Sequence, residues 1–252
     1  MTLSTIRNNP AKQKKVKTKK QKAIAATCAV AFWLLVWHVV SLCVGSELVL
    51  VSPVKVVQTL FTVIFDPDFL KTVWYSAARI LGGFFTALTL GTVLGWVASR
   101  FWVVETLLRP ITAVIKATPV ASFIILVLLW FSGKNLSVII SMLMVFPVIY
   151  MNVLEGIRSA DEKLLEMAQV FRLSVGKKLL YIYLPAVAPF FVSACSVSLG
   201  LCWKSGIAAE VIGTPDGSIG AVFYQAKIFL QTSELLAWTV VVVAVSVAFE
   251  KL

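Results

Sequence analysis

Three ionisable side chains, Lys116, Lys204 and Glu210, lie inside long apolar stretches and are the residues best placed to bind a polar solute. A charge in the middle of a membrane-spanning helix costs on the order of 2.5–3.5 kcal/mol and is usually kept for a function. We therefore predict that these residues line a polar path. Two structural alternatives stay open: Lys116 snorkels to the membrane interface, and Lys204 or Glu210 pairs with another helix.

No catalytic constellation accompanies these charges. The sequence lacks the HExxH, GxSxG and Walker phosphate-loop patterns. His38 has no His, Cys or carboxylate beside it at metal-ligand spacing, and the four cysteines form no CxxC pair. We expect a chain that is not an enzyme and that binds no metal and no cofactor of its own.

The composition predicts an all-α polytopic membrane protein. Hydrophobic residues make up 59% of the 252 residues and charged residues only 14%, whereas a soluble domain carries about a quarter charged residues. The apolar residues gather in blocks long enough to cross a bilayer, where helices satisfy their own backbone polar groups. The net charge of +11 does not indicate nucleic-acid binding, because eight of the 23 basic residues lie in the first 22 positions.

We predict a basic cytoplasmic tail over residues 1–22 and a transmembrane domain over residues 23–252 with about six helices. Sixteen Lys and Arg residues then fall on one side and four on the other, which indicates that both termini are cytoplasmic. The chain stops just after the last helix, and we favour a natural C-terminus beyond residue 252. The six spans are expected at about 23–44, 77–99, 111–131, 136–154, 185–212 and 234–249.

Local signals refine this outline. Gly91 and Gly95 form a GxxxG pattern that favours close packing within the chain. Arg100 and Arg109 mark a short inner loop, and Pro147 is expected to interrupt the fourth span. Short helices are predicted from Pro53 and after the turn at residues 215–217.

The segment from Ser159 to Pro185 is polar and helical in pattern although apolar spans flank it. Ser159 and Glu162 have the spacing of a capping box, which predicts a helix from Ala160. A second helix is expected after Ser174, ending before Pro185. A helix lying on lipid would favour basic over acidic residues in its first turns, so we favour a docking surface for a cytoplasmic partner. Its apolar face would comprise Leu164, Leu165, Ala168 and Phe171.

This segment resembles the EAA motif of ABC importer permeases. The matching residues are Glu166-x-Ala168 followed by Ile182-x-Leu184-Pro185, with similar flanks NVLEGIRSADEKLLEMAQVF and SLGLCWKSGIAAEVIG. The stretches SPVKVV and ATPVASFIILVLLWFSGKNLS resemble the nitrate/sulfonate/taurine branch in particular, and the similarity extends from about residue 48 onward. Met167 replaces the middle Ala of the motif, and Arg172 stands where the family has a Gly that permits a tight turn.

The resemblance implies the fold of a type I ABC importer permease, with a coupling-helix loop over residues 156–184. It also implies that ATP-Mg binds a separate cytoplasmic ATPase dimer, that two permease copies (identical or different) assemble, and that an extracytoplasmic binding protein delivers the solute. The location would be the bacterial inner membrane, and the solute a nitrate-, sulfonate- or taurine-like compound or a vitamin precursor. Residues implied to contact the ATPase are Glu162, Leu165, Glu166, Ala168, Gln169, Phe171 and Arg172.

One alternative from another class is a stand-alone secondary transporter or channel. Such a protein would need an inverted repeat or a clear row of pore-lining charges. The sequence has neither feature. A membrane scaffold without transport is disfavoured by the polar residues of the fifth span.

Overall fold

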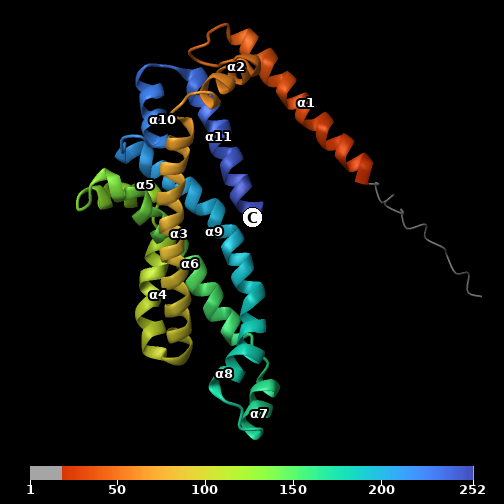
Figure 1. Cartoon of the computed structure of the whole chain (residues 1–252), viewed down its shortest axis with the longest axis vertical. Helices are drawn as coiled ribbons and strands as arrows, with labels where there is room; N and C mark the ends of the chain where they lie inside the picture. Colours follow the sequence, from red (N-terminus) through yellow and green to blue (C-terminus); the bar gives the residue numbers. More distant parts are fainter. Residues whose placement is uncertain (1–18, 252) are drawn as a thin grey trace, which may run out of the picture. The chain divides into compact units, whose positions relative to one another are not determined.

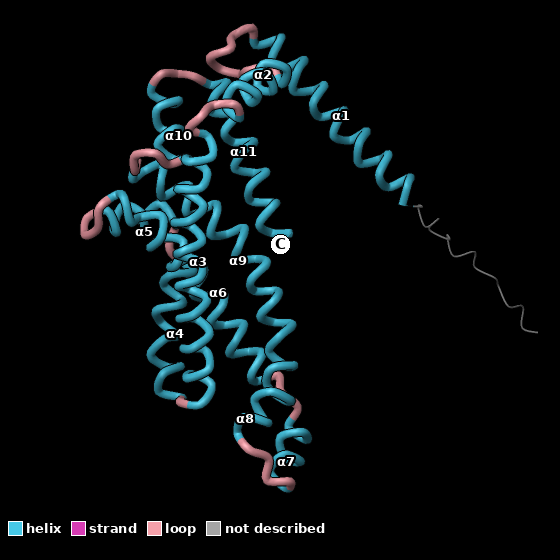
Figure 2. Tube along the Cα trace, viewed as in Figure 1, coloured by secondary structure: helices cyan, strands magenta, loops and turns pink. Residues whose placement is uncertain are grey.

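The computed structural model describes residues 19–251, so residues 1–18 of the expected basic tail lie outside the described part (Figure 1). Every regular element between residues 19 and 251 is a helix (Figure 2). Five of these helices are long and apolar enough to cross a membrane, or six if one sharply bent pair counts as a span. The predicted all-α polytopic architecture is thereby confirmed.

The chain divides into two compact units, residues 1–54 and 55–252. The described part of the first unit is dominated by α1 (Lys19–Val44), which begins four residues before the expected start of the first span. Its large apolar side chains are exposed, Trp33 at 67% for example. Such a surface suits a helix that faces lipid.

In the second unit, α6 (Gly133–Arg158) packs against both α3 (Phe69–Arg100) and α9 (Leu184–Gly213) (Figure 1). Glycines permit the close approach of α3 to α6. A Cβ on Gly91 would lie 3.0 Å from Ile149 Cβ, and one on Gly95 would lie 3.0 Å from Val153 Cγ1. The GxxxG pattern therefore packs within the chain, as predicted.

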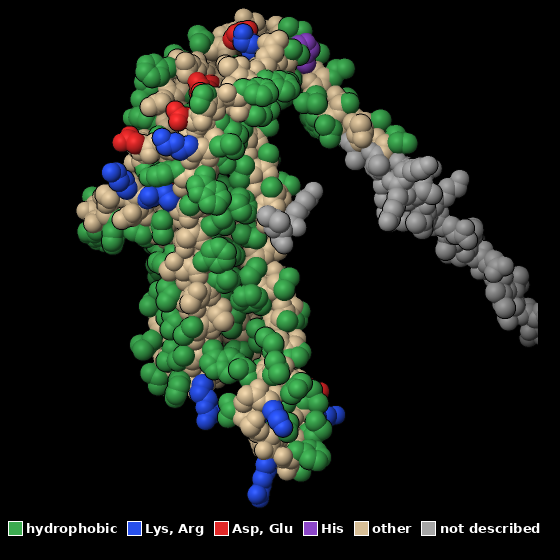
Figure 3. Space-filling view, viewed as in Figure 1, with side chains coloured by type: hydrophobic (Ala, Val, Ile, Leu, Met, Phe, Trp, Pro, Cys, Tyr) green, Lys and Arg blue, Asp and Glu red, His purple; other side chains and the backbone are tan. Residues whose placement is uncertain are grey.

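The main core lies where these three helices meet α11 (Thr232–Lys251) and the short α10 (Ile219–Ile228). Trp203 and Ile80 are fully buried in it. The amphipathic helix predicted from Pro53 is present as α2 (Pro53–Ile64). Figure 3 shows charged side chains gathered toward the two ends of the second unit, with hydrophobic side chains between them.

The third span, predicted over residues 111–131, is divided into two helices. The structure has α4 (Trp102–Ala117) and α5 (Val120–Leu128), bent by 106° at the break. Thr118 adopts an extended conformation (φ −83°, ψ 133°) because the following Pro119 disfavours helical geometry at the preceding residue. The expected inner loop is also shorter, since only Phe101 separates α3 from α4 and Arg109 lies within α4.

The prediction that Pro147 interrupts the fourth span is wrong. Helix α6 runs without a break from Gly133 to Arg158, and Pro147 is buried inside it. Proline removes one backbone hydrogen bond from a helix. Here α6 lies between α3 and α9, and packing on both sides holds the helix continuous.

Candidate functional site

The loop between α6 and α9 contains a nine-residue helix, α7 (Glu162–Val170), that begins two residues later than the sequence suggested. The cap is Asp161, whose carboxylate accepts a hydrogen bond of 2.9 Å from the Lys163 backbone N–H. Ser159 instead ends α6, and its hydroxyl donates to the Gly156 carbonyl at 2.8 Å. The predicted capping box is therefore wrong, because the end of the preceding helix already engages Ser159.

At its other end α7 closes with a Schellman motif. The Leu173 N–H donates to the Ala168 carbonyl at 2.9 Å, and the Arg172 N–H donates to the Gln169 carbonyl at 3.0 Å. This motif needs a left-handed residue after the helix, and Arg172 has φ +49°. The left-handed turn expected of the family glycine is thus retained by an arginine, at a cost in strain.

The expected apolar face of α7 is divided between two environments. Ala168 is completely buried with Ala160 and Ile182, and Leu165 packs on the same cluster. Phe171, by contrast, is 70% exposed and Val170 79% exposed. The side of α7 that carries Leu165 and Ala168 therefore packs toward the start of α9. The side that carries Val170 is exposed to solvent. Of the residues implied to contact an ATPase, those exposed to solvent are Glu162, Glu166, Gln169, Phe171 and Arg172.

From Val175 onward the connection to α9 is helical throughout, contrary to the prediction that its second helix ends before Pro185. Helix α8 (Val175–Lys178) passes into a π turn, η1 (Leu179–Tyr183), which leads directly into α9. Pro185 has no N–H to continue the helical hydrogen bonds, and the π turn lies directly before it. The helical span from Val175 to Gly213 is therefore a continuous link between the loop and the membrane.

The three ionisable residues singled out in the spans lie in three different places. Lys116 is exposed and lines a cavity of about 480 Å³ on α4 together with Arg109 and Met151. Lys204 is exposed in a second cavity, of about 510 Å³, between α9 and α11. Glu210 is completely buried. The sequence places all three in spans but does not distinguish these environments.

Glu210 belongs to a buried polar cluster that joins α3, α9 and α10. The Ser76 hydroxyl donates to Glu210 Oε2 at 2.6 Å and accepts a hydrogen bond of 2.9 Å from the Ile219 N–H. The Gly220 N–H donates to the same Glu210 oxygen at 3.4 Å. Because Ser218 Oγ accepts from the Ala221 N–H at 3.0 Å, the first three backbone donors of α10 all have side-chain partners.

Gly220 makes this arrangement possible. A Cβ at this position would collide with the backbone carbon and the Cβ of Glu210. Only a glycine lets α10 begin directly against α9. The sequence did not identify Ser76 or Gly220 as partners of Glu210. Ser76 lies 134 residues before Glu210 and Gly220 lies 10 residues after it, and nothing in a single sequence links these positions.

Arg79 lies close to this cluster. Its Nε donates to Ser137 Oγ at 3.4 Å and its Nη1 to Tyr75 Oη at 3.2 Å. The guanidinium also lies over the Tyr75 ring, 5.1 Å from its centroid. Arg79 therefore ties α3 to α6 near the N-terminal end of α6.

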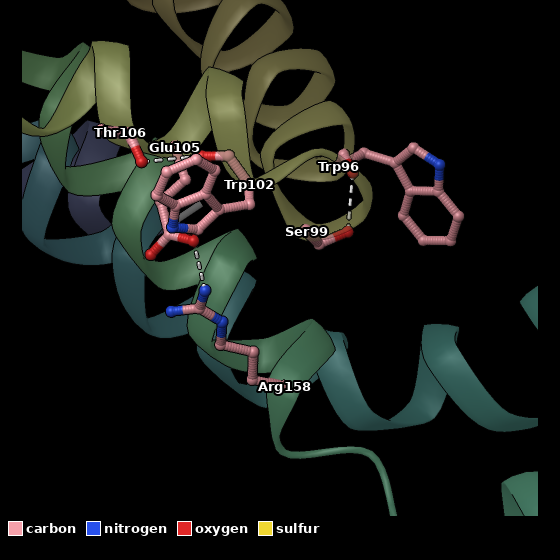
Figure 4. A network of polar contacts seen from close by, with 6 residues as sticks. All are labelled: Trp96, Ser99, Trp102, Glu105, Thr106 and Arg158. Atoms are coloured by element: carbon pink, nitrogen blue, oxygen red, sulfur yellow. Dashed lines mark hydrogen bonds and ion pairs between the residues drawn. The ribbon is translucent and has the colours of Figure 1, made fainter.

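A second polar site lies between α4 and α6. Arg158 Nη2 and Glu105 Oε2 are 2.5 Å apart and form an ion pair that joins the two helices (Figure 4). The pair borders a cavity of about 270 Å³ that also includes Arg109, Thr112 and Tyr150. Arg109 and Thr112 line the Lys116 cavity as well, so the two cavities form one polar groove, named here the α4–α6 groove.

Within residues 19–251 no three His, Cys, Asp or Glu side chains are placed to hold a metal ion. The cysteines described by the structure are unpaired: Cys28 and Cys43 are exposed, and Cys202 is buried.

Comparison with known proteins agrees with this organisation. Residues 87–249 match the family model described as binding-protein-dependent transport system inner membrane component. The putative aliphatic sulfonates transport permease protein SsuC of Bacillus subtilis (strain 168) is 29% identical over 211 residues, covering 82% of this chain and 76% of SsuC. The taurine transport system permease protein TauC of Escherichia coli (strain K12) is 27% identical over 220 residues, covering 85% and 80%.

A third relative is the nitrate import permease protein NrtB of Synechocystis sp. (strain ATCC 27184 / PCC 6803 / Kazusa), 25% identical over 214 residues, or 81% of this chain and 76% of NrtB. All three relatives are transport permeases, which disfavours the stand-alone transporter or channel. The family match covers more than half of the chain and includes the EAA-like segment and the loop between α6 and α9. The chain therefore belongs to the family of binding-protein-dependent transport system inner membrane components, the multi-pass permease subunits of ABC importers.

Proposed function

We propose that this permease forms half of the membrane path of an ATP-driven importer and that α7 docks in a groove of a cytoplasmic ATPase. The second half of the path would be another copy of the chain. ATP-Mg would bind the ATPase, and an extracytoplasmic binding protein would deliver the solute. With α7 on the cytoplasmic side, both termini would lie inside, and the excess of Lys and Arg on that side supports this orientation by the positive-inside rule.

One observation supports this proposal: α7 exposes apolar and acidic residues to solvent, whereas its Ala168 packs in the buried cluster with Ala160 and Ile182. Phe171, Val170 and Met167 are 70%, 79% and 47% exposed, and Glu162 and Glu166 lie beside them. Large apolar side chains on a water-facing helix mark a protein contact, and a helix laid into a groove uses residues spaced three and four apart. Glu162, Glu166, Gln169, Phe171 and Arg172 would make this contact.

Ala168 and Leu165 have a different role in this proposal. They pack against Ile182 and Ala186 at the start of α9, so a displacement of α7 is transmitted to α9. Helix α6 ends at Arg158, three residues before the α7 cap. Movement of the ATPases would in this way tilt α6 and α9 together as a rigid body, as in other transporters that alternate between two states.

For the solute path we propose the α4–α6 groove, with Lys116 and Arg109 as its cations. The named solutes of the relatives are sulfonates, taurine and nitrate, which all carry an anionic group. Exposed cations beside an apolar wall lower the cost of an anion at membrane depth. Lys204 would add a third cation on α9. Glu210 would act indirectly, because it holds the start of α10 rather than facing an open cavity.

The docking surface is tested by co-purification of the tagged permease with the ATPase expressed beside it. We expect Glu166→Lys and Phe171→Ala to reduce the recovered ATPase by roughly tenfold or more, as at other interface hot spots. The matched control is Asp216→Lys, the same charge reversal in the turn before α10. Full recovery of the ATPase with Glu166→Lys would exclude α7 as the docking element.

The path is tested separately in proteoliposomes by uptake of taurine, an alkanesulfonate and nitrate. Lys116→Gln should reduce uptake of the transported anion, whereas Lys227→Gln in the last turn of α10 should not. ATPase recovery should be unchanged in both variants. Uptake that is unaffected by Lys116→Gln would remove this groove from the path.

A further inference from the structure

A cavity of about 480 Å³ opens beside the α7–α8 loop, on the side of α3 away from the α4–α6 groove. Six of its lining residues come from three separate parts of the chain: Trp96, Arg100, Ile157, Lys178, Leu179 and Tyr183. Figure 4 shows the Trp96 ring directed away from the Glu105–Arg158 pair. The cavity is therefore distinct from the groove proposed for the solute.

Two cations converge on this cavity without a counter-charge. Arg100 is the last residue of α3, and Lys178 is the last residue of α8. No acidic side chain lines the cavity, and neither cation forms an ion pair within residues 19–251. Lys178 is half-buried, and an anionic group in the cavity would pair with both cations.

The π turn explains why these residues share one cavity. In an α-helix, side chains five residues apart point about 140° away from each other. A π turn bonds residue i to i+5 and brings such residues toward one face. The bond from the Leu184 N–H to the Leu179 carbonyl has this spacing, and both Lys178 and Tyr183 line the cavity.

The rest of the lining is apolar and aromatic. The Trp96 and Tyr183 rings meet edge to face, with centroids 5.5 Å apart. Trp96 and Leu179 are 39% and 44% exposed, and Ile157 is buried. Trp and Tyr are enriched where a membrane protein meets the headgroup layer. A free phosphate ion would pair with the cations but leave this apolar rim in water, whereas a lipid would cover both.

We propose that this cavity binds the headgroup of an anionic phospholipid from the inner leaflet. Its phosphate would lie between Arg100 and Lys178, and its first acyl carbons would cover Trp96 and Leu179. Basic pockets between membrane helices bind anionic headgroups in this way. The proposal rests on the orientation given under the proposed function, with α7 on the cytoplasmic side. Since Lys178 and Tyr183 precede α9, the lipid would brace the link between the coupling loop and the span.

The test uses the full-length permease in neutral detergent, with native mass spectrometry to count bound phosphatidylglycerol and phosphatidylcholine. Wild type should retain phosphatidylglycerol in preference, and Arg100→Gln/Lys178→Gln should weaken that binding at least about fivefold. The control, Lys163→Gln/Lys177→Gln, removes two charges from the same loop without touching the cavity lining. Equal retention of phosphatidylglycerol in the two double variants would overturn the proposal.

Two further measurements separate the sources of the anion. Inorganic phosphate should raise the midpoint of thermal unfolding of the permease far less than phosphatidylglycerol does at equal concentration. An equal effect would indicate a site for a free anion instead. If Arg100→Gln/Lys178→Gln loses the ATPase while keeping its lipid, the cations contact that protein and the lipid site is refuted. A permease that binds its ATPase normally but does not discriminate between the two lipids would refute this inference alone and leave the transport proposal intact.

Discussion

The hydrogen bonds of Ser76 offer a direct measure of what anchors α10. Ser76→Ala removes the donor to Glu210 Oε2 and the acceptor for the Ile219 N–H. Both Ser76 and Glu210 are completely buried, so water cannot replace either bond. Leaving a buried amide unpaired costs about 1–3 kcal/mol, and a lost bond to a carboxylate roughly 1.5–3 kcal/mol. We expect a total destabilisation of about 3–5 kcal/mol.

The chain contains a matched control for this substitution. Ser198 on α9 is also completely buried, but its hydroxyl has no hydrogen-bond partner. Ser198→Ala deletes the same atom at the same burial and should therefore be neutral or slightly stabilising. The difference between the two variants isolates the hydrogen bonds from the loss of side-chain volume.

The assay is thermal unfolding of the purified permease with Cys28, Cys43 and Cys195 replaced by Ser, followed by a thiol-reactive dye that reports exposure of the buried Cys202. For a chain of this size about 3 kcal/mol corresponds to a drop in midpoint of roughly 6–12 °C. Hydrogen exchange should also accelerate in α10 and not in α6. If both alanine variants shift the midpoint equally, the hydrogen-bond argument fails.

Three other experiments test particular features of the fold by the same unfolding assay. Arg172→Gly should stabilise the permease by about 1 kcal/mol, because glycine adopts φ +49° without strain; a lower midpoint would show that the arginine side chain contributes more than its backbone costs. Gly220→Ala should destabilise by about 1–3 kcal/mol through its clash with Glu210, whereas Gly200→Ala, with open space around its Cα, should gain about 0.5–1 kcal/mol; equal effects would contradict the close approach of α10 to α9. In a double-mutant cycle, Glu105→Gln and Arg158→Gln should couple by only about 0.2–1 kcal/mol, since both side chains are partly exposed, and a coupling above 2 kcal/mol would mean that the pair is desolvated.

The helices that follow from local rules were predicted well. Helix α9 begins at Leu184 and ends at Gly213, close to the expected 185–212, because a long apolar stretch is bounded by a proline and a turn. The turn at Gly217 has φ +74°, as its Pro-Asp-Gly sequence suggests. Periodicity and turn chemistry act over a few residues, so one sequence contains the information.

The sequence-based predictions of helix ends and breaks were wrong where two elements compete for one residue or where tertiary packing outweighs local helix propensity. Ser159 has the spacing of an N-cap, yet it completes α6, and Asp161 caps α7 instead. Pro147 would break an isolated helix, but α6 is packed on two sides and continues through it. Local preference is a weak determinant once tertiary contacts form.

The loop between α6 and α9 also combines features that the local sequence predicts with features that depend on tertiary packing. The EAA-like pattern identifies α7 and its position between two spans. Which side of α7 is free depends on the cluster of Ala160, Ala168 and Ile182, and Ile182 is 14 residues from Ala168. The sequence pattern therefore predicted a docking helix, whereas only the folded structure shows which residues of that helix are exposed.

By itself, the sequence determined that this chain is an all-α polytopic permease and that a polar helix lies between two of its spans, and it predicted an asymmetry of charge across the membrane. These properties depend on hydropathy and on a short motif, which are local. Only the tertiary structure decided that Glu210 is buried against Ser76 and Gly220, that Lys116 and Lys204 line separate cavities, and that Arg100 and Lys178 share a third. Those relations join residues from different helices, and helix packing alone brings them together.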